Sequence, residues 1–204
     1  TGQYGGTWRR AHMGMPDEAG WMRLTYDPLL RWNEDYSKPI PNIARRWEVS
    51  EDGRQFTFWL RKGMKWSDGH PFTTEDFIFW YEEIILNEDM TPVAPNWLTA
   101  GGQIGVVEAL DDYTLRFSFA VPNGVIVQWL ASWSELVAGP PPKHYLKQFH
   151  PKFVNEDSLN VRVDVEGYDT WMALYETKSN PFLNPDRPVI SAWQAKTGAD
   201  APIF

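Results

Sequence analysis

ARRWEVSEDGRQFTFWLRKGMKWSDGHPFTTEDFIFWY, residues 44–81, is the stretch that decides the fold. In its first segment Trp47 and Val49 alternate with charged and polar neighbours, which is the period-two pattern of a half-buried strand. Asp52-Gly53 follows at once, and glycine tolerates the positive φ that a tight hairpin turn requires. The return segment alternates again. We therefore expect one buried face on this hairpin, made by Trp47, Val49, Phe56, Phe58 and Leu60.

A third short strand and a helix complete this stretch. Met64 and Trp66 resume the alternation after Gly63. Thr73 stands where an N-cap belongs and Asp76 follows three residues later, which is close to the capping-box pattern. Apolar residues then recur at helical spacing at Phe77, Trp80, Tyr81, Ile84 and Ile85. The stretch thus predicts a β-hairpin unit followed by a helix.

The same two periods recur along the rest of the chain. Alternation predicts strands over 106–110 and 113–120, joined at Asp111-Asp112, with one shared face made by Tyr113, Leu115, Phe117 and Phe119. We also expect a strand at 7–11, a stiff connection at 37–41, loops at 12–20 and 87–96, and extended chain at 189–193. Helices are expected at 21–32, interrupted or ended near Asp27-Pro28, at 123–129 with Asn123 as cap, at 143–149 and at 168–178. The pattern indicates an α+β fold.

Composition narrows the classes of partner and chemistry. The formal net charge of -8 argues against nucleic acid or an anionic membrane surface as a partner, because both repel an acidic protein. The sequence has no cysteine, which excludes disulfides and thiolate metal ligands. No apolar run is long enough to span a membrane, and Thr1-Gly2-Gln3 is not a signal peptide, so we expect a mature or trimmed chain.

Residues that could support catalysis or metal binding are few. Asp111-Asp112 is the obvious carboxylate pair, yet it stands at a predicted hairpin turn, where Asp is ordinary turn chemistry. Glu82-Glu83 is expected to be solvated, because the apolar face of its helix points elsewhere. The histidines are scattered in sequence, and we expect loop or surface positions for His12, His70, His144 and His150. The sequence therefore predicts no catalytic residue, no metal site and no cofactor.

The first stretch also resembles the signature region of a known family. The matching words are Ala44-x-x-Trp47-x-Val49-Ser50-x-Asp52-Gly53, Phe56-Thr57-Phe58-x-Leu60-Arg61-x-Gly63-Met64-x-Trp66-x-Asp68-Gly69 and Phe72-Thr73-x-Glu75-Asp76-Phe77. Weaker echoes occur at Gly5-Gly6-Thr7, 26–30, 107–115, 142–144 and 184–186. In these segments the chain is similar to the large solute-binding proteins of ABC importers, family 5, which includes oligopeptide- and dipeptide-binding proteins.

The resemblance implies an architecture. It implies one lobe of a periplasmic-binding-protein-like fold of type II, oligopeptide-binding-like, in which a mixed sheet forms the base. Residues 1–44 with 180–204 are expected to form this base layer, and residues 45–179 an α/β subdomain inserted into it. Because members of the family are longer, the resemblance also implies that a second lobe is missing from these 204 residues.

The resemblance implies a function as well. It points to an extracytoplasmic protein that captures an oligopeptide or oligosaccharide and delivers it to an importer permease, with the membrane reached only through a lipid anchor or the permease. Two loops are expected to face the ligand, and their candidate contact residues are His12, Met13, Gly14, Met15, Pro16, Val93, Ala94, Asn96 and Trp97. Methionine offers adaptable apolar contact, Asn hydrogen bonds and Trp stacking.

Two alternatives stay open at this point. Trp97 could instead pack against the preceding helix, since Trp residues are highly buried on average. A second function class, an aromatic-rich carbohydrate-active enzyme or glycan-binding module, is motivated by the 12 tryptophans. The length of the signature match favours the solute-binding protein, because the second class leaves that match unexplained.

Overall fold

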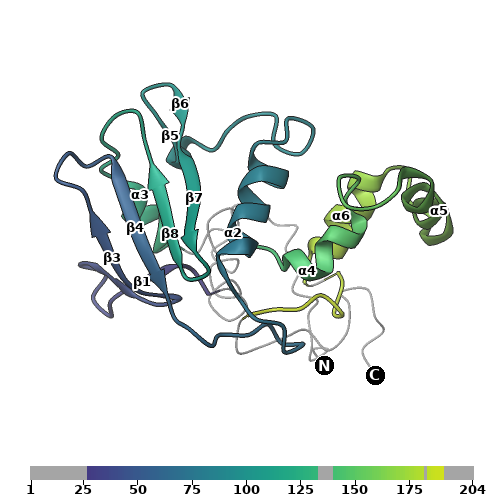
Figure 1. The fold of residues 1–204 in the computed structure, drawn as a ribbon, viewed down its shortest axis with the longest axis horizontal. Helices are drawn as coiled ribbons and strands as arrows, with labels where there is room; N and C mark the ends of the chain where they lie inside the picture. Colours follow the sequence, from purple (N-terminus) through teal and green to yellow (C-terminus); the bar gives the residue numbers. More distant parts are fainter. Residues whose placement is uncertain (1–26, 133–139, 182, 191–204) are drawn as a thin grey trace, which may run out of the picture.

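An antiparallel four-stranded sheet organises the first part of the molecule. The computed structural model describes residues 27–132, 140–181 and 183–190. The sheet has the strand order β3-β4-β8-β7, made by β3 (Ala44–Val49), β4 (Gln55–Leu60), β8 (Thr114–Ser118) and β7 (Val106–Asp111). The two predicted hairpins are thus confirmed, and they pair with each other through β4 and β8. Figure 1 shows this sheet at one end of the molecule.

The register places the predicted apolar residues on one face of this sheet. Phe58 lies opposite Trp47 on one side and opposite Leu115 on the other. Phe56, Phe58 and Leu60 are buried, as are Leu115, Phe117 and Phe119. Trp47 is only partly buried, and the expectation of a buried Val49 is wrong, since its side chain is 46% exposed. Val49 faces inward, opposite Phe56, but β3 is an edge strand and its far end extends past the core.

Two small hairpins flank the main sheet. β1 (Leu30–Trp32) pairs with β2 (Pro39–Pro41), and β5 (Thr99–Ala100) pairs with β6 (Gln103–Ile104). β1 begins after Asp27-Pro28, where the predicted 21–32 helix is expected to be interrupted or to end, and residues 21–26 of that helix lie outside the described residues. The stiff connection at 37–41 is partly a strand. The sequence Leu30-Arg31-Trp32 is too short to show either period clearly, and pairing with β2 decides its conformation.

Helix α2 (Thr74–Trp80) starts at the predicted cap. The Thr73 side chain accepts from the Glu75 amide at 3.3 Å, and the Asp76 carboxylate accepts from the Thr73 amide at 3.3 Å. This reciprocal pair is the predicted capping box, which satisfies helix N–H groups that have no partner within the helix. A π-helical turn (Tyr81–Ile85) continues the helix.

Most of the remaining helices lie at the other end of the molecule. They are α4 (Lys143–Leu146), α5 (Glu156–Glu166) and α6 (Trp171–Ser179), with a 3-10 turn (Lys147–Phe149) extending α4. Short α3 (Ile126–Leu130) and a 3-10 turn (Asn96–Leu98) lie with the sheet. Helix α5 was not predicted. Its caps are clear, Asn155 and Gly167, but Val161 and Val165 are exposed and blur the apolar face.

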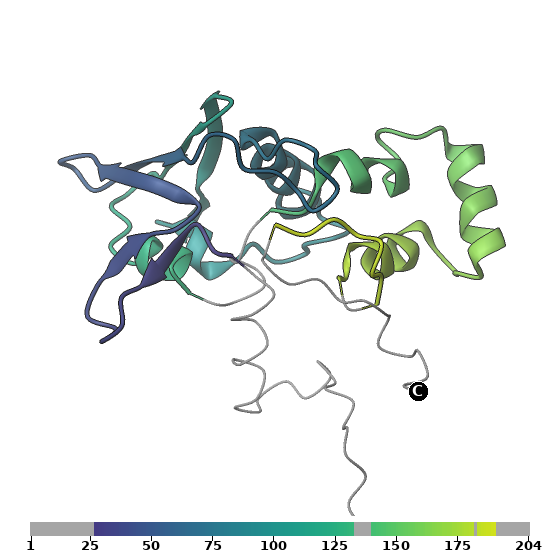
Figure 2. The ribbon, with the colours of Figure 1, turned by 90° about the horizontal axis from the view of Figure 1, so that it is seen from below.

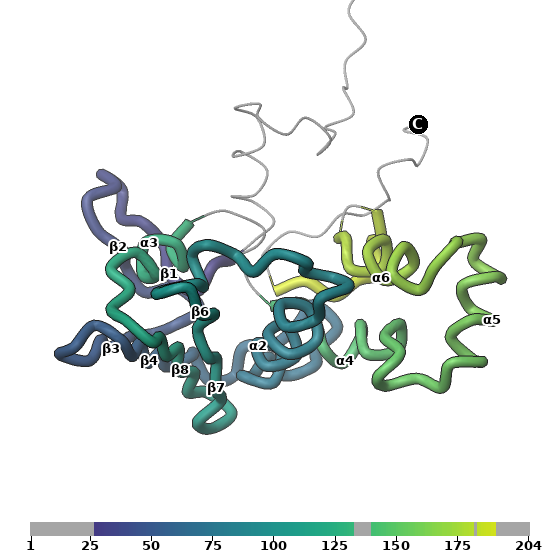
Figure 3. Tube along the Cα trace, turned by 90° about the horizontal axis from the view of Figure 1, so that it is seen from above, coloured from purple at the N-terminus to yellow at the C-terminus, as the bar shows by residue number. Residues whose placement is uncertain are grey.

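The described residues form two hydrophobic cores, and α2 contributes to both. We call the sheets with α2 and α3 the sheet unit, and α4–α6 the helical unit. Phe77, Tyr81 and Ile85 join the core of the sheet unit, whereas Phe79 joins the core of the helical unit. Figure 2 and Figure 3 show α2 between the main sheet and the helical unit, with α5 at the far end.

Asp76 holds the two units together at the start of α2. Its buried carboxylate accepts from the Trp66 indole N–H at 3.2 Å and from the Lys143 amide at 3.0 Å, in addition to the Thr73 amide. Burial raises the pKa of Asp76 above its ordinary value, against the effect of these hydrogen bonds. Beside it, Lys143 and Glu75 form a salt bridge of 3.1 Å.

The proposed division into a base layer (1–44 with 180–204) and an insertion (45–179) stays a prediction. Much of the base layer lies outside the described residues, as do the predicted strand at 7–11 and residues 191–193 of the extended chain. Within the described part, Leu29, Leu30 and Ile43 share the core of the sheet unit. At the other boundary, the Ser67 and Val189 main chains are joined by a hydrogen bond of 2.8 Å.

Candidate ligand-binding site

One of the two predicted ligand loops can be placed. His12, Met13, Gly14, Met15 and Pro16 lie outside the described residues. The second loop, 91–97, follows the π-helical turn of α2 and leads into β5. The relation between the two loops therefore stays a prediction, and the description below concerns the second loop, including Val93, Ala94, Asn96 and Trp97.

Short hydrogen-bonded turns fix the course of this loop. The Asn87 side-chain oxygen accepts from the Asp89 amide at 3.0 Å, and the Thr91 hydroxyl donates to the Ile84 carbonyl at 2.6 Å. At the other end the Thr99 hydroxyl donates to the Pro95 carbonyl at 3.0 Å. Asn and Thr favour such local bonds to the backbone, so the loop is shaped before any ligand arrives.

The loop presents some side chains and buries others. Val93 is 80% exposed, Asn96 is exposed and Ala94 is intermediate. Trp97 is buried, 4% exposed, and stacks on Trp80 of α2 with ring centroids 5.9 Å apart and planes inclined by 11°. The structure thus shows Trp97 packed on the helix, which was the alternative considered for it. Val93 and Asn96 are exposed, so both side chains can contact a ligand without any change in the loop.

Asn123 anchors this loop to the rest of the sheet unit. Its side-chain nitrogen donates to the Trp97 carbonyl at 3.2 Å, and its side-chain oxygen accepts from the Val125 amide at 3.2 Å. Its own amide donates to the Gly53 carbonyl at 3.0 Å. The sequence identified Asn123 only as a helix cap. Its contact with the loop is between residues far apart in sequence, for which no local pattern gives a signal.

Helix α3 adds apolar surface beside the loop. Its buried side, Ile126 and Leu130, packs in the core of the sheet unit, and the helix contacts the Asn96–Leu98 turn. Val125 and Trp129 lie one helical turn apart and are 53% and 40% exposed. The sequence analysis did not single out Trp129, because a Trp in an apolar helix is more often buried. An exposed indole on a helix that contacts this turn suits a neutral ligand with an apolar face.

The histidines are less scattered than the sequence suggested. The rings of His70 and His144 stack, with centroids 3.9 Å apart and planes inclined by 3°, and His144 Nε2 lies 2.7 Å from Asp68 Oδ2. Partial burial opposes ionisation of Asp68, but hydrogen bonds from the His70 amide and His144 lower its pKa below the ordinary value. Across the described ranges, no group of three or more His, Cys, Asp or Glu residues is arranged to hold a metal ion.

Three further sequence expectations can be checked. Asp111 stabilises the hairpin turn, as predicted, because its carboxylate accepts hydrogen bonds from the Tyr113 amide and the Thr114 hydroxyl. These bonds, chiefly the one from Thr114, lower the pKa of Asp111. The expectation of a solvated Glu83 is wrong, since it is buried and paired with Lys152. His150 is not on the surface either, at 3% exposed. Both corrections arise because the helical unit covers one side of α2.

The sequence and the fold can be compared with known proteins at this point. The model of the bacterial extracellular solute-binding proteins, family 5, middle part, matches residues 38–188. The chain belongs to this family. The match covers the signature stretch and most of both units, so the resemblance seen in the sequence is confirmed. The extracytoplasmic location expected from it is confirmed with it, because this family is extracellular and relatives are named as periplasmic proteins.

Individual relatives agree with the family 5 assignment. The chain is 35% identical over 128 residues to a periplasmic alpha-galactoside-binding protein of Rhizobium meliloti, covering 62% of this chain and 18% of that protein. A solved oligopeptide-binding protein OppA superposes with a TM-score of 0.81 at 38% identity, covering 98% of this chain and 30% of that one. A solved MelB from Agrobacterium fabrum, in complex with stachyose, gives 0.63 at 27% identity, covering 84% and 24%.

These superpositions confirm the predicted fold class. The family 5 chain has an α+β structure of the periplasmic, oligopeptide-binding type, and it spans less than a third of the length of the three relatives named above. In the part that the structure describes, no helix is long and apolar enough to cross a membrane. The candidate contact residues are not tested by any of these comparisons and remain predictions.

Proposed function

We propose that this family 5 chain is part of the substrate-binding component of an ABC transporter. It captures an oligopeptide or an oligosaccharide outside the cytoplasm and delivers it to the permease, without nucleic acid, cofactor or catalysis. The observation that carries the proposal is the family match over residues 38–188. Contact with the membrane is made only through the permease or a lipid anchor.

Two ligand classes are supported, each by a similar protein. The Rhizobium relative is named for alpha-galactosides and the MelB structure holds stachyose, whereas the OppA structure is named for oligopeptides. The exposed Trp129 on α3 suits either class, because an indole stacks on the flat face of a sugar ring or on an apolar peptide side chain. The candidate ligand wall therefore consists of the 91–97 loop with α3, together with the predicted loop His12–Pro16.

Calorimetric titration of the full-length natural polypeptide that contains this chain tests the proposal. Stachyose and raffinose would be titrated in one series, and peptides of two to five residues in another. Saturable binding of members of one series is the expected result. Chromatography of the same mixtures checks that the ligand is recovered intact. Reproducible cleavage of the sugar would favour the alternative, a carbohydrate-active enzyme, and absence of binding to both series would contradict the proposal.

The same titration tests the loop. Asn96→Ala removes an exposed amide without disturbing the core, and we expect binding to weaken by about tenfold, the effect of losing roughly one ligand hydrogen bond. Gln55→Ala is a matched control, because Gln55 is also an exposed amide but belongs to β4 and not to the 91–97 loop. Equal affinities for Asn96→Ala and the wild type would remove Asn96 from the site while leaving the family function intact.

A further inference from the structure

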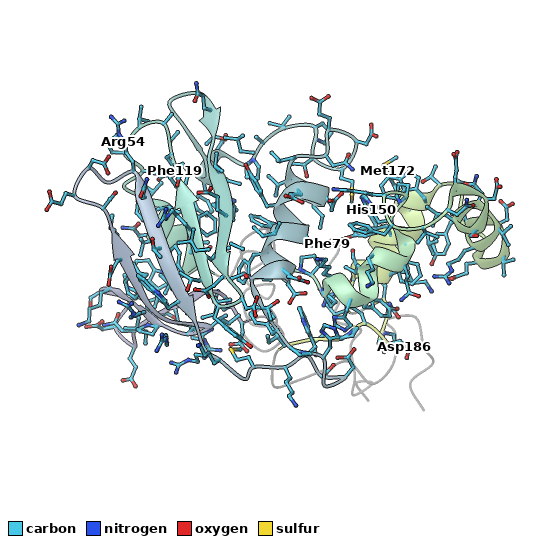
Figure 4. All side chains as sticks on the ribbon, viewed as in Figure 1. Arg54, Phe79, Phe119, His150, Met172 and Asp186 are labelled. Atoms are coloured by element: carbon cyan, nitrogen blue, oxygen red, sulfur yellow. The ribbon has the colours of Figure 1, made fainter. Side chains whose placement is uncertain are left out.

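A buried imidazole lies at the centre of the helical unit. His150 is 3% exposed and is surrounded by aromatic rings from three elements. The centroid of its ring lies 5.2 Å from Trp171, 5.7 Å from Phe153, 6.0 Å from Tyr175 and 6.4 Å from Phe79. Figure 4 shows Phe79 on α2 and His150 on the facing side of the helical unit. No step of the proposed function uses this residue.

The hydrogen bonds of His150 fix its protonation state. The Lys152 amide donates to Nδ1 at 3.3 Å, so Nδ1 carries a lone pair and the ring proton is on Nε2. Within the described residues, Nε2 makes no hydrogen bond of regular geometry, and the Glu83 backbone beside the ring favours the protonated form. A second proton would have to be placed on Nδ1, where it would face the Lys152 N–H. Protonation therefore breaks this bond and sets a second N–H donor against the Lys152 N–H.

The charged groups around the ring do not compensate for this loss. Glu83, from the π-helical turn, is buried and attracts a proton to His150, but it is already paired with Lys152, whose charge repels that proton. Tyr175, from α6, stays neutral because burial raises the pKa of its hydroxyl. The negative charge of Glu82 raises the pKa of Lys152, and it does not shift the pKa of His150 or Tyr175. Burial dominates, and it lowers the pKa of His150 below 6.5.

We propose that His150 is a pH-sensitive latch, whose protonation opens the helical unit while the sheet unit stays folded. In the closed unit the ring is neutral, and on opening it gains water and can take up a proton. The two units have separate cores, which permits one to open without the other. Since the family is extracellular, this latch is exposed to the pH of the surroundings.

The sign and size of the effect follow from proton linkage. The closed unit binds fewer protons than the open one, so its stability is complete above the ordinary pKa of 6.5 and falls as the pH drops below it. The fall ends at the lower pKa of the closed state. Between about pH 7.5 and about pH 5.5, the open population should rise by up to about tenfold.

Hydrogen exchange measured by mass spectrometry at these two pH values tests the latch. Rates are divided by the intrinsic exchange rate at each pH. In the wild type, we expect peptides from α5 and α6 to exchange up to about tenfold faster at the lower pH, while peptides from β4 and β8 change little. Equal acceleration in both units, or none in α5 and α6, would overturn the proposal.

Three variants identify the group responsible. His150→Gln keeps a neutral acceptor for the Lys152 amide, and His150→Phe fills the aromatic surroundings if the first variant folds poorly. Either should abolish the pH step in α5 and α6. His144→Gln is the matched control, because His144 is the other described histidine of the helical unit, and it should leave the step unchanged. Persistence of the step without an imidazole at position 150 would refute the latch.

Discussion

Phe58→Ala tests the assignment of the buried sheet face. Phe58 is 0% exposed at the middle of β4, opposite Trp47 on one neighbouring strand and Leu115 on the other. Its ring meets Phe117 edge to face, with centroids 5.7 Å apart and planes inclined by 85°. Hydrogen-bonded strands on both sides hold the surroundings in place, so the cavity left by the substitution cannot easily collapse.

The expected loss of unfolding free energy follows from this environment. Truncating a buried Phe to Ala costs about 3–5 kcal/mol, the sum of lost transfer free energy and the cavity that remains. Roughly 0.5–1.5 kcal/mol of that loss belongs to the edge-to-face contact with Phe117. Since both neighbouring strands restrict relaxation, we expect a value of about 4 kcal/mol.

Urea denaturation followed by far-UV circular dichroism and by tryptophan fluorescence measures this loss. The two probes must give coincident transitions, because two cores could unfold separately. Val49→Ala is the control: Val49 lies on the same face, opposite Phe56, but is 46% exposed at the sheet edge. It should cost less than about 1 kcal/mol. A loss below about 1 kcal/mol for Phe58→Ala, or equal losses for both variants, would refute the assignment.

Two further substitutions test polar contacts by the same denaturation assay. Thr73→Ala removes half of the capping box of α2 and should cost about 1 kcal/mol, whereas an unchanged midpoint would mean that the cap does not stabilise the helix. Asn123→Ala leaves the Trp97 carbonyl and the Val125 amide without their partner and should cost about 1–3 kcal/mol. A cost below about 0.5 kcal/mol would show that water replaces Asn123 at the loop.

Local patterns explain which parts of the fold could be predicted. The period of two in Phe56, Phe58 and Leu60, and the cap at Thr73, act between neighbours in sequence and need no tertiary information. Val49 has the same period, yet its exposure depends on β3 being an edge strand. The alternation of residues predicts which face of the strand Val49 lies on. It does not predict whether the strand lies at the edge of the sheet, because that depends on the order of all four strands, so the burial of Val49 was predicted wrongly. Helix α5 was not predicted because Val161 and Val165 are exposed on it, so its apolar residues do not recur at a clear helical spacing.

The candidate site was harder to predict than the fold. Asn96 and Val93 could be proposed because the family resemblance marked their loop, and both are exposed in the structure. Asn123 reaches Trp97 from 26 residues away, and Glu83 is covered by Lys152 from 69 residues away. Contacts over such distances in sequence leave no periodic trace. The neutral His150 is likewise defined only by what packs around it.

The carboxylate of Asp76 also has a consequence for the order of assembly. It receives one N–H from Trp66, one from Thr73 and one from Lys143, and the last is 67 residues further along the chain. During synthesis the acceptor is therefore made, and can be oriented by the first two donors, well before the third emerges. Helix α4 then begins on an anchor that the earlier residues have already built. The later helices therefore pack against a part of the chain that is already folded. A chain that failed to form the start of α2 would lack the carboxylate to which the start of α4 is bound.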